Sequence, residues 1–457
     1  MLKRTLAATA ALILALPGTG AGQTAPGRGG PLRTLTTIPA PELVESSSDQ
    51  DGGQKGGRKR PEGWRFVWAN STPSLRYGRV FRLDFRFKLQ EDARKPGDAP
   101  LPFDTWDLHR LRGGVDGELF NRVQFSIERE LYEPRILDRD DEGFNETLWK
   151  DVYADVNITR AFQVRAGRFK IPFGGEQLTG TTNLDFVYRS LGATYLSPAR
   201  DVGIAVHGPI LGGGLNYWVG GFKHDGDNSR SRRIQGGDET LAARLTAQPW
   251  NQPKGPGVLE ISAGFMRSAV SDASVLPNGL RGRTVMSKYD FYEPVFVKGP
   301  RTRLETDAEL MAGPFSARGE YTWMSDERLE QGFGSDDLPE ARARAWYISG
   351  TMVVTGERKD RPVEPRHWFG ALEVAGRLER IRFAGVPGED TPFRNPRAVT
   401  IFPVANQVGA VGLNWYVNRW VKVQVNAVRE RVDDVERSPV ADGAAFWSRV
   451  LRLQLAL

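Results

Sequence analysis

The chain has 457 residues, no cysteine and a formal net charge of +6. The absence of cysteine excludes a disulfide framework, thiolate metal sites and a cysteine nucleophile. The charge does not indicate nucleic-acid binding, because only 60 of the 62 basic residues remain after loss of Lys3 and Arg4 with the predicted signal peptide, against 56 acidic residues, and no concentrated basic stripe with a known motif is present.

Residues 1–22 have the features of a secretory signal peptide. Lys3 and Arg4 precede an apolar run at 6–16, and small residues follow at 20–22. We therefore expect export, with cleavage near Ala21 or Gly22. The apolar run is too short to span a bilayer, and no later run reaches the length of a transmembrane helix, so insertion in a membrane would require strands.

Residues 23–63 are rich in Gly, Pro, Ser and charge, and offer few apolar side chains to bury. This composition predicts a flexible tether. The basic cluster 58–60 could touch an anionic surface, but it also fits a solvated linker. Residues 64–457 have a uniform composition with no boundary signal, which predicts a single domain.

Residues 81–89 (FRLDFRFKL) alternate five large apolar side chains with four charged ones. Successive side chains of a strand point to opposite faces, so this strand has one apolar face and one strongly charged face. A barrel wall between lipid and water requires both. Similar alternation recurs at 123–128, 151–158, 421–426 and 451–457. The pattern therefore predicts a membrane pore built from strands.

The connections also favour an outer-membrane barrel. A short turn at 417–420 is flanked by Trp415, Tyr416 and Trp420, as expected for an aromatic girdle at the periplasmic interface. Long polar connections are predicted at 133–145, 225–238 and 357–366 for the opposite end. At roughly 24 residues for each strand with its connection, residues 64–457 give about 16 strands, and roughly 14 or 18 would also fit.

Several segments match one known family in order and spacing. They are residues 166–179 (AGRFKIPFGGEQLT), 197–204 (SPARDVGI) with 207–208, 319–321 (GEY), 346–357 and 412–416 (GLNWY). With these segments the chain resembles the phosphate-selective porins (O/P type) of Gram-negative outer membranes. The resemblance implies a homotrimer of 16-stranded antiparallel β-barrels, each passing small anions past a loop folded into the channel.

By position, the constricting loop would follow residues 170–174 and extend to Arg200, and Gly and Pro in this segment fit a departure from the wall. The loop contains few lysines, and no dense lysine cluster can be aligned onto it. The resemblance in fold therefore does not by itself imply specificity for phosphate.

Arginine and lysine at a constriction are the general means of selecting anions. Strand parity places Arg76, Arg82, Arg86 and Lys88 on the lumen face, together with Asp84, and it also directs Arg165 inward. Within the loop, Arg189 and Arg200 are the strongest basic candidates. Any of these cations could instead pair with wall carboxylates such as Glu128, Asp155, Glu320 or Glu373, or in the case of Arg200 with Asp201, and so support the wall without selecting ions.

We therefore predict a passive, water-filled channel in the outer membrane for small inorganic anions, phosphate or polyphosphate among them. A general or cation-tolerant porin is an alternative, as is a structural or adhesin barrel or a barrel-embedded hydrolase. The four histidines are scattered without metal-ligand spacing, and no nucleophile elbow is present. We expect no enzymatic activity and no cofactor, metal or nucleic-acid partner. The expected surrounding partner is outer-membrane lipid.

Overall fold

A computed structural model describes residues 63–69, 72–97, 106–132, 148–226, 238–251, 257–272, 277–386 and 396–457. The predicted signal peptide and all but the last residue of the predicted tether lie outside these ranges. No helix within them is long and apolar enough to cross a membrane.

Eighteen strands of the described residues form one sheet, and two short strands form another. The first half of the large sheet consists of β1 (Trp64–Ala69), β2 (Thr72–Tyr77), β3 (Phe81–Pro96), β4 (Trp106–Leu119), β5 (Val123–Glu130), β6 (Trp149–Thr159), β7 (Phe162–Lys170), β8 (Arg200–Ile210) and β9 (Leu215–Phe222). The second half consists of β10 (Asp238–Asn251), β11 (Gly257–Val270), β14 (Gly299–Ala312), β15 (Phe315–Arg328), β16 (Leu338–Val353), β17 (Ala371–Phe383), β18 (Val404–Tyr416), β19 (Val421–Val432) and β20 (Phe446–Ala456).

The remaining elements are short and lie in the connections. They are β12 (Gly282–Arg283), β13 (Asp290–Tyr292), the helices α2 (Gly175–Leu178) and α3 (Leu191–Tyr195), and the 3-10 turns η1 (Thr181–Asn183), η2 (Leu211–Gly213), η4 (Val435–Arg437) and η5 (Ala441–Gly443).

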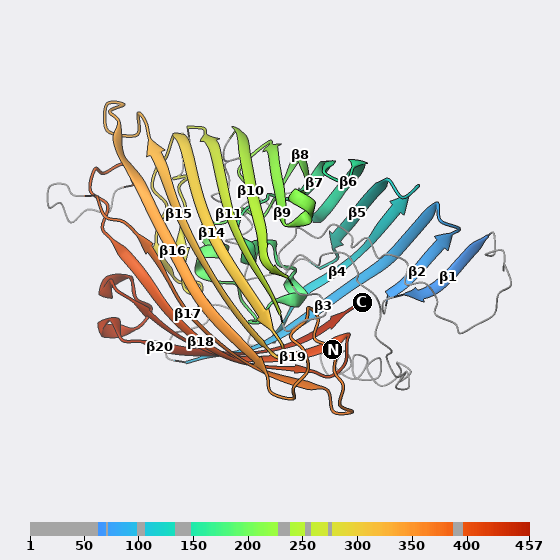
Figure 1. The fold of residues 1–457 in the computed structure, drawn as a ribbon. Coiled ribbons are helices and arrows are strands. Elements are labelled where there is room, and N and C mark those ends of the chain that lie inside the picture. The colour runs from blue at the N-terminus through green and yellow to red at the C-terminus, as the bar shows by residue number, and fades with distance from the viewer. Residues whose placement is uncertain are drawn as a thin grey trace.

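The large sheet closes on itself. From β3 onward each strand of this sheet pairs antiparallel with the next one along the chain, and β20 returns to pair with β3, with Leu455 opposite Leu89. Because β1 and β2 form a side hairpin, 16 of the 18 strands make the closed wall (Figure 1). The prediction of an antiparallel barrel of about 16 strands is confirmed.

The wall is charged inside and apolar outside. Along β17, Glu373, Arg377 and Glu379 are buried, whereas Val374 and Leu378 are 44% and 58% exposed. A soluble protein would show the opposite distribution, since apolar side chains gain by leaving water. Exposed apolar side chains on a closed barrel are typical of a surface that faces lipid. The predicted parity of residues 81–89 is also confirmed, because Arg82, Arg86 and Lys88 meet partners inside the barrel.

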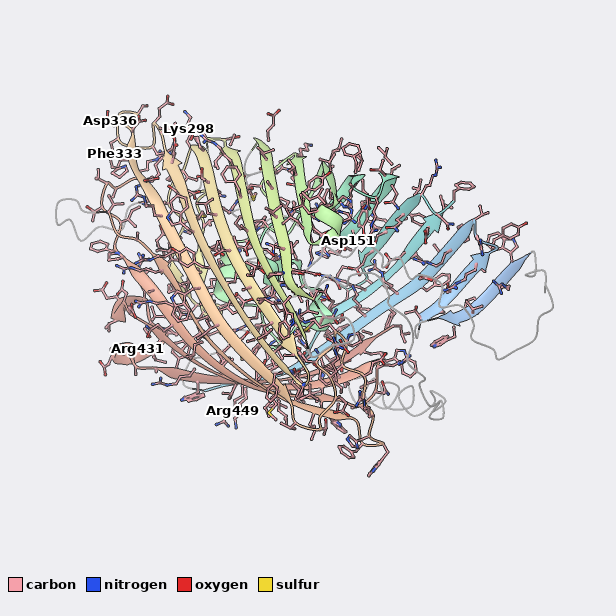
Figure 2. All side chains as sticks on the ribbon, viewed as in Figure 1. Asp151, Lys298, Phe333, Asp336, Arg431 and Arg449 are labelled. Carbon is pink, nitrogen blue, oxygen red and sulfur yellow. The ribbon has the colours of Figure 1, made fainter. Side chains whose placement is uncertain are left out.

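The two ends of the barrel differ. Short turns at 120–122, 160–161, 313–314 and 417–420 share one end with the chain terminus, and long connections, including 171–199 and 271–298, share the other. Figure 2 labels Lys298, Phe333 and Asp336 at the long-connection end. The prediction for 357–366 is wrong in one respect: this long polar segment belongs to the connection between β16 and β17, which lies at the short-turn end.

The short-turn end carries exposed aromatic side chains, as expected for an interfacial girdle. Trp415 is exposed and its indole nitrogen donates to the Phe369 carbonyl at 2.7 Å, while Trp420 contacts Trp68 edge to face. The expectation for Tyr416 is wrong, because this ring is buried and its hydroxyl donates to Glu373 inside the barrel at 2.7 Å.

The β1–β2 hairpin lies beside the first strand of the wall. β2 pairs with residues 81–84 of β3, below the segment of β3 that β20 covers. The apolar face of the hairpin, with Trp64 and Phe66 exposed, continues the outer face of β3, since Trp64 contacts Phe81. Arg76, which parity from β3 would direct into the lumen, is on this hairpin and donates to Ser74 at 3.2 Å.

Candidate functional site

The connection between β7 and β8, residues 171–199, folds into the barrel and is hereafter the constriction loop. Its first residues, Ile171 and Phe173, are completely buried against lumen-facing side chains of β7 to β11, among them Trp218 and Met266. Its far part, including Phe186 and Leu191, joins a second apolar cluster with the inner faces of β15 to β19. The predicted inward loop is therefore present, with the short helices α2, η1 and α3 in place of an irregular segment.

Buried charged side chains of the wall hold the backbone of the constriction loop. On the carbonyl side, Lys422 Nζ donates to Thr182 and Leu184 at 3.0 and 2.9 Å, and Arg452 donates to Val187 at 2.9 Å. On the amide side, Glu320 accepts from Glu176 at 2.8 Å and Glu379 accepts from Leu191 at 2.7 Å. The loop is thus tied to β15, β17, β19 and β20 through hydrogen bonds to its buried backbone.

A second inward segment comes from the short-turn end, residues 354–370. Lys359 Nζ donates to Asp185 of the constriction loop at 2.6 Å and also to Glu373, and Arg361 donates to Glu309 at 2.8 Å. Burial alone would lower the pKa of Lys359, but Asp185 and Glu373 outweigh burial and raise it. Val363 is completely buried with Tyr416 in a small apolar cluster. The two inward segments are therefore clamped together from opposite ends of the barrel.

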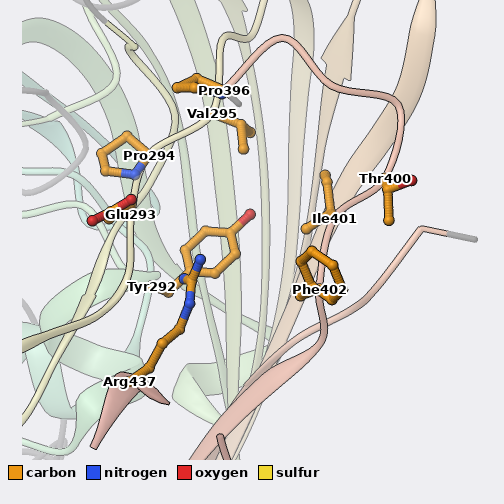
Figure 3. A pocket seen from close by; sticks show the side chains of 9 residues that line it. All are labelled: Tyr292, Glu293, Pro294, Val295, Pro396, Thr400, Ile401, Phe402 and Arg437. Carbon is orange, nitrogen blue, oxygen red and sulfur yellow. The ribbon is translucent and has the colours of Figure 1, made fainter. Parts of the chain in front are cut away.

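A third segment, the connection at 277–298, enters from the long-connection end. The amide of Val285 donates to Glu430 at 2.9 Å, and Met286 packs against Val187 of the constriction loop. Outside this contact, Tyr292 of the third segment lines a small rim pocket with Arg437 and with residues of the connection at 396–402 (Figure 3). The Arg437 guanidinium donates to the Phe291 carbonyl at 3.2 Å, so this pocket helps to hold the third segment in place.

Water reaches one side of the lumen more than the other. The side chains of Arg86 and Lys88 on β3 are 22% and 18% exposed, whereas those of Arg377 and Arg452, beneath the constriction loop, are each 2% exposed. The more water-accessible part of the lumen, hereafter the passage, therefore lies between the constriction loop and the inner faces of β3 to β6, where Asp151 is also partly exposed.

The predicted cations of β3 line this passage and have carboxylate partners. Arg82 contacts Glu118 at 3.3 Å, Arg86 contacts Asp116 at 2.9 Å and Lys88 contacts Glu128 at 2.5 Å. These three pairs connect β3 to β4 and β5. Their charges are largely neutralised locally, so the three cations alone do not give the passage a strong positive field.

The two candidates assigned to the loop differ from each other. Arg200 is not in the loop but begins β8, and its Nε and one terminal nitrogen donate to the two carboxylate oxygens of Asp151, at 2.9 and 2.8 Å. Arg189 lies in the loop and donates to the carbonyl oxygens of Glu176 and Thr179 at 3.2 and 2.7 Å. Burial, together with the positive charge of Arg200 and other neighbouring arginines, lowers the pKa of Arg189 to about 10, so it remains charged at neutral pH.

Two cations of the same region were not predicted. Arg110 on β4 donates to Gln90 Oε1 at 2.5 Å, and Lys170 at the end of β7 donates to three loop carbonyls, the shortest distance being 2.6 Å to Gln177. None of Arg110, Lys170 and Arg189 forms an ion pair within 4 Å with a carboxylate of the described residues. Arg189 is within electrostatic range of both other cations. These three residues, hereafter the unpaired cations, lie near one another beside the passage.

Arg165 points inward as predicted but has no contact with water. Its guanidinium contacts Asp155 at 2.7 Å and lies over the rings of Tyr153 and Trp218, 4.2 and 4.9 Å from their centroids. His207, stacked on Trp218, contacts the same carboxylate at 2.9 Å. The role of Arg165 in an anion pathway stays a prediction, and its surroundings indicate a contribution to the wall.

We expect Arg165→Met to lower the free energy of unfolding by about 3 kcal/mol or more, because it leaves Asp155 buried without its main partner. Ion selectivity should change little, since the side chain does not reach the passage. Urea-induced unfolding in lipid vesicles measures the first effect and the reversal potential the second. A clear loss of anion selectivity at unchanged stability would place Arg165 in the pathway instead.

No group of three or more potential metal ligands occurs among the residues that the structure describes. A closed barrel of 16 strands with a lipid-facing exterior, a water-accessible lumen and an inward loop defines an outer-membrane porin.

Solved structures of outer-membrane proteins share this fold. OmpT of Vibrio cholerae, folded in vitro, has 12% identity and a TM-score of 0.51, covering 84% of this chain and 99% of its own. OprB of Pseudomonas putida at high pH has 10% identity and a TM-score of 0.51, covering 83% and 94%. The outer-membrane channel DcaP of Acinetobacter baumannii has 11% identity and a TM-score of 0.50, covering 83% and 98%. At these identities the likeness concerns the fold alone.

The sequence itself identifies the family of the chain. The model of the phosphate-selective porin O and P family matches residues 77–457, so the chain belongs to this family. Comparison with curated protein sequences found no match. The protein is thus an outer-membrane porin, a channel and not an enzyme, of a family whose name implies the passage of anions.

Proposed function

We propose that this porin passes small oxyanions, phosphate or short polyphosphate, by diffusion between the constriction loop and the inner faces of β3 to β6. The observation that carries the proposal is the set of unpaired cations, Arg110, Lys170 and Arg189, beside a passage whose other charges are paired. An oxyanion that leaves water needs replacement donors, and guanidinium groups match its geometry.

The unpaired cations bind neutral oxygens of the protein, and this suits passage. Arg189 and Lys170 both donate to the Thr179 carbonyl, which fixes the position of both side chains without a carboxylate. A permeating anion then meets attraction without having to displace a carboxylate. Conduction requires that such attraction be strong enough for entry and weak enough for release.

The wild-type protein should be anion-selective in planar bilayers. Reversal potentials in a potassium chloride gradient measure this, and added phosphate should reduce the chloride current as it occupies the passage. Cation selectivity would favour the alternative of a cation-tolerant porin, for which the paired carboxylates Glu118, Asp116 and Glu128 would then be responsible. Absence of conductance would favour a structural barrel.

We also propose that residues 1–22 are removed as a signal peptide, that residues 23–63 form a tether before the barrel domain, and that the porin assembles as a homotrimer. The first two rest on composition, and the third rests on the family resemblance. Mass spectrometry of the purified protein, alone and in detergent complexes under native conditions, tests cleavage and assembly together.

A further inference from the structure

The outer face of the barrel carries a dense group of cations at the long-connection end. This outer basic patch lies on β3, β16, β17, β19 and β20, and all of its members are at least partly exposed. They are Lys95, Arg342, Arg344, Arg380, Arg382, Arg429, Arg431 and Arg449. Figure 2 labels Arg431 and Arg449, whose side chains point away from the barrel.

The strand register brings like charges together in the outer basic patch. Arg344 is directly opposite Arg382, and Arg449 is directly opposite Lys95. Like charges at directly opposed positions of a sheet repel each other. Such an arrangement is unfavourable unless an anion lies between the cations.

The described residues supply few such anions. Arg342 pairs with Glu340, and Arg380 contacts Asp433 at 2.8 Å. The other six cations have no ion pair with a described carboxylate. Seven of the eight are arginine, whose fork can bind two phosphate oxygens at once and stays charged at any physiological pH.

The surroundings of the patch place it at the level of lipid headgroups. Along the same strands, the next outward positions toward the short-turn end are apolar, including Trp346, Leu378 and Leu451, all exposed. Trp447 is 45% exposed directly opposite Arg429, which is typical of an aromatic side chain at a membrane interface. The long connections begin on the other side of the patch. The cations therefore lie between the hydrocarbon band and the aqueous end of the barrel.

We propose that the outer basic patch binds the phosphate groups of an anionic lipid in the leaflet on the long-connection side. The arginine guanidinium groups donate hydrogen bonds to the phosphate oxygens, and the acyl chains lie along the apolar side chains toward the short-turn end. Neighbouring strands are about 4.8 Å apart, so cations on alternate strands such as β17 and β19 can bind different phosphates of one headgroup. The patch is separate from the lumen cations, because it lies on the opposite face of the wall.

The test compares two triple variants that lose the same charge. The first is Arg382→Gln, Arg431→Gln and Arg449→Gln within the patch. The second, a control, is Arg129→Gln, Lys223→Gln and Arg267→Gln, three exposed outward cations dispersed over β5, the end of β9 and β11. Native mass spectrometry in detergent counts bound phosphatidic acid, with phosphatidylcholine and inorganic phosphate as comparison ligands. The gel shift between heated and unheated protein verifies that each variant is folded.

We expect the wild type and the control variant to retain phosphatidic acid, and the patch variant to bind it about tenfold more weakly. Conductance should be the same in all three. Equal loss in both variants would overturn the proposal, since the effect would then be one of general charge. It would also be overturned if inorganic phosphate bound the patch as well as the lipid does, or if the patch variant lost only its oligomeric state, which would make this face a contact between copies of the chain.

Discussion

Arg189→Glu is expected to abolish the anion preference of the channel or reverse it. The side chain lies in the constriction loop beside the passage and within electrostatic range of Arg110, Lys170 and Arg200. Replacing its positive charge by a negative one changes the local charge by two elementary units. Interactions of this kind amount to more than 1.4 kcal/mol in a partly dehydrated channel, and the chloride-to-potassium permeability ratio should fall about tenfold or more. The reversal potential in a salt gradient measures the ratio directly.

Two further variants separate selectivity from damage to the loop. Arg189→Gln keeps donors to the Glu176 and Thr179 carbonyls and should give an intermediate ratio. Arg267→Glu makes the same charge reversal on the outer face of β11 and should leave the ratio unchanged. A reversal potential that is the same in wild type and Arg189→Glu would remove the loop from the selectivity mechanism.

The second large effect is expected for Lys359→Met. The substitution leaves Asp185 and Glu373 buried without the cation that both of them contact. Breaking a buried ion pair by removing one partner costs about 3–5 kcal/mol, and we expect the free energy of unfolding to fall by this amount. Because Asp185 belongs to the constriction loop, the attachment of the loop at the short-turn end should also weaken, with only the 3.7 Å contact between Arg361 and Asp185 remaining there. Single-channel recordings should then show greater open-channel noise, alongside the lower stability seen in urea.

Arg358→Met is the matched control for this prediction. Arg358 precedes Lys359 in the chain, but its side chain is 39% exposed, and its ion pair among the described residues is with the similarly exposed Asp360 at 3.6 Å. Pairs of this kind contribute about 0–1 kcal/mol. If both substitutions reduced stability equally, the clamp between Lys359 and the constriction loop would not be a source of stability.

The wall of the barrel could be predicted because its side chains have a period of two. Residues 81–89 specify both faces of β3 without any knowledge of distant residues, and the lumen position of Arg82, Arg86 and Lys88 follows from parity alone. The site of Arg189 could be predicted for a different reason, namely the family resemblance of the segments on both sides of the loop.

Other parts of the site depend on information that the local sequence does not carry. Arg110 was missed because an irregularity in the pairing of β3 with β4, next to His109, interrupts simple parity. Lys170 acquires its role from three carbonyl groups of a loop that returns to it. Residues 354–370 have the composition of a solvated connection. The inward position of Lys359 and Arg361 within it results from partners on other elements, namely Asp185, Glu309 and Glu373.

The side hairpin bears on how the barrel acquires its first and last strands during folding. Residues 81–84 of β3 pair with β2, the preceding strand in the sequence. Only the later part of β3, from Lys88 onward, pairs with β20, which is the last strand of the chain. An unpaired strand edge invites association with other chains, and a locally formed hairpin masks part of that edge from the outset. In export intermediates of this porin, the unpaired edge of the first wall strand would thus be shorter than in a barrel whose first strand is unpaired along its whole length.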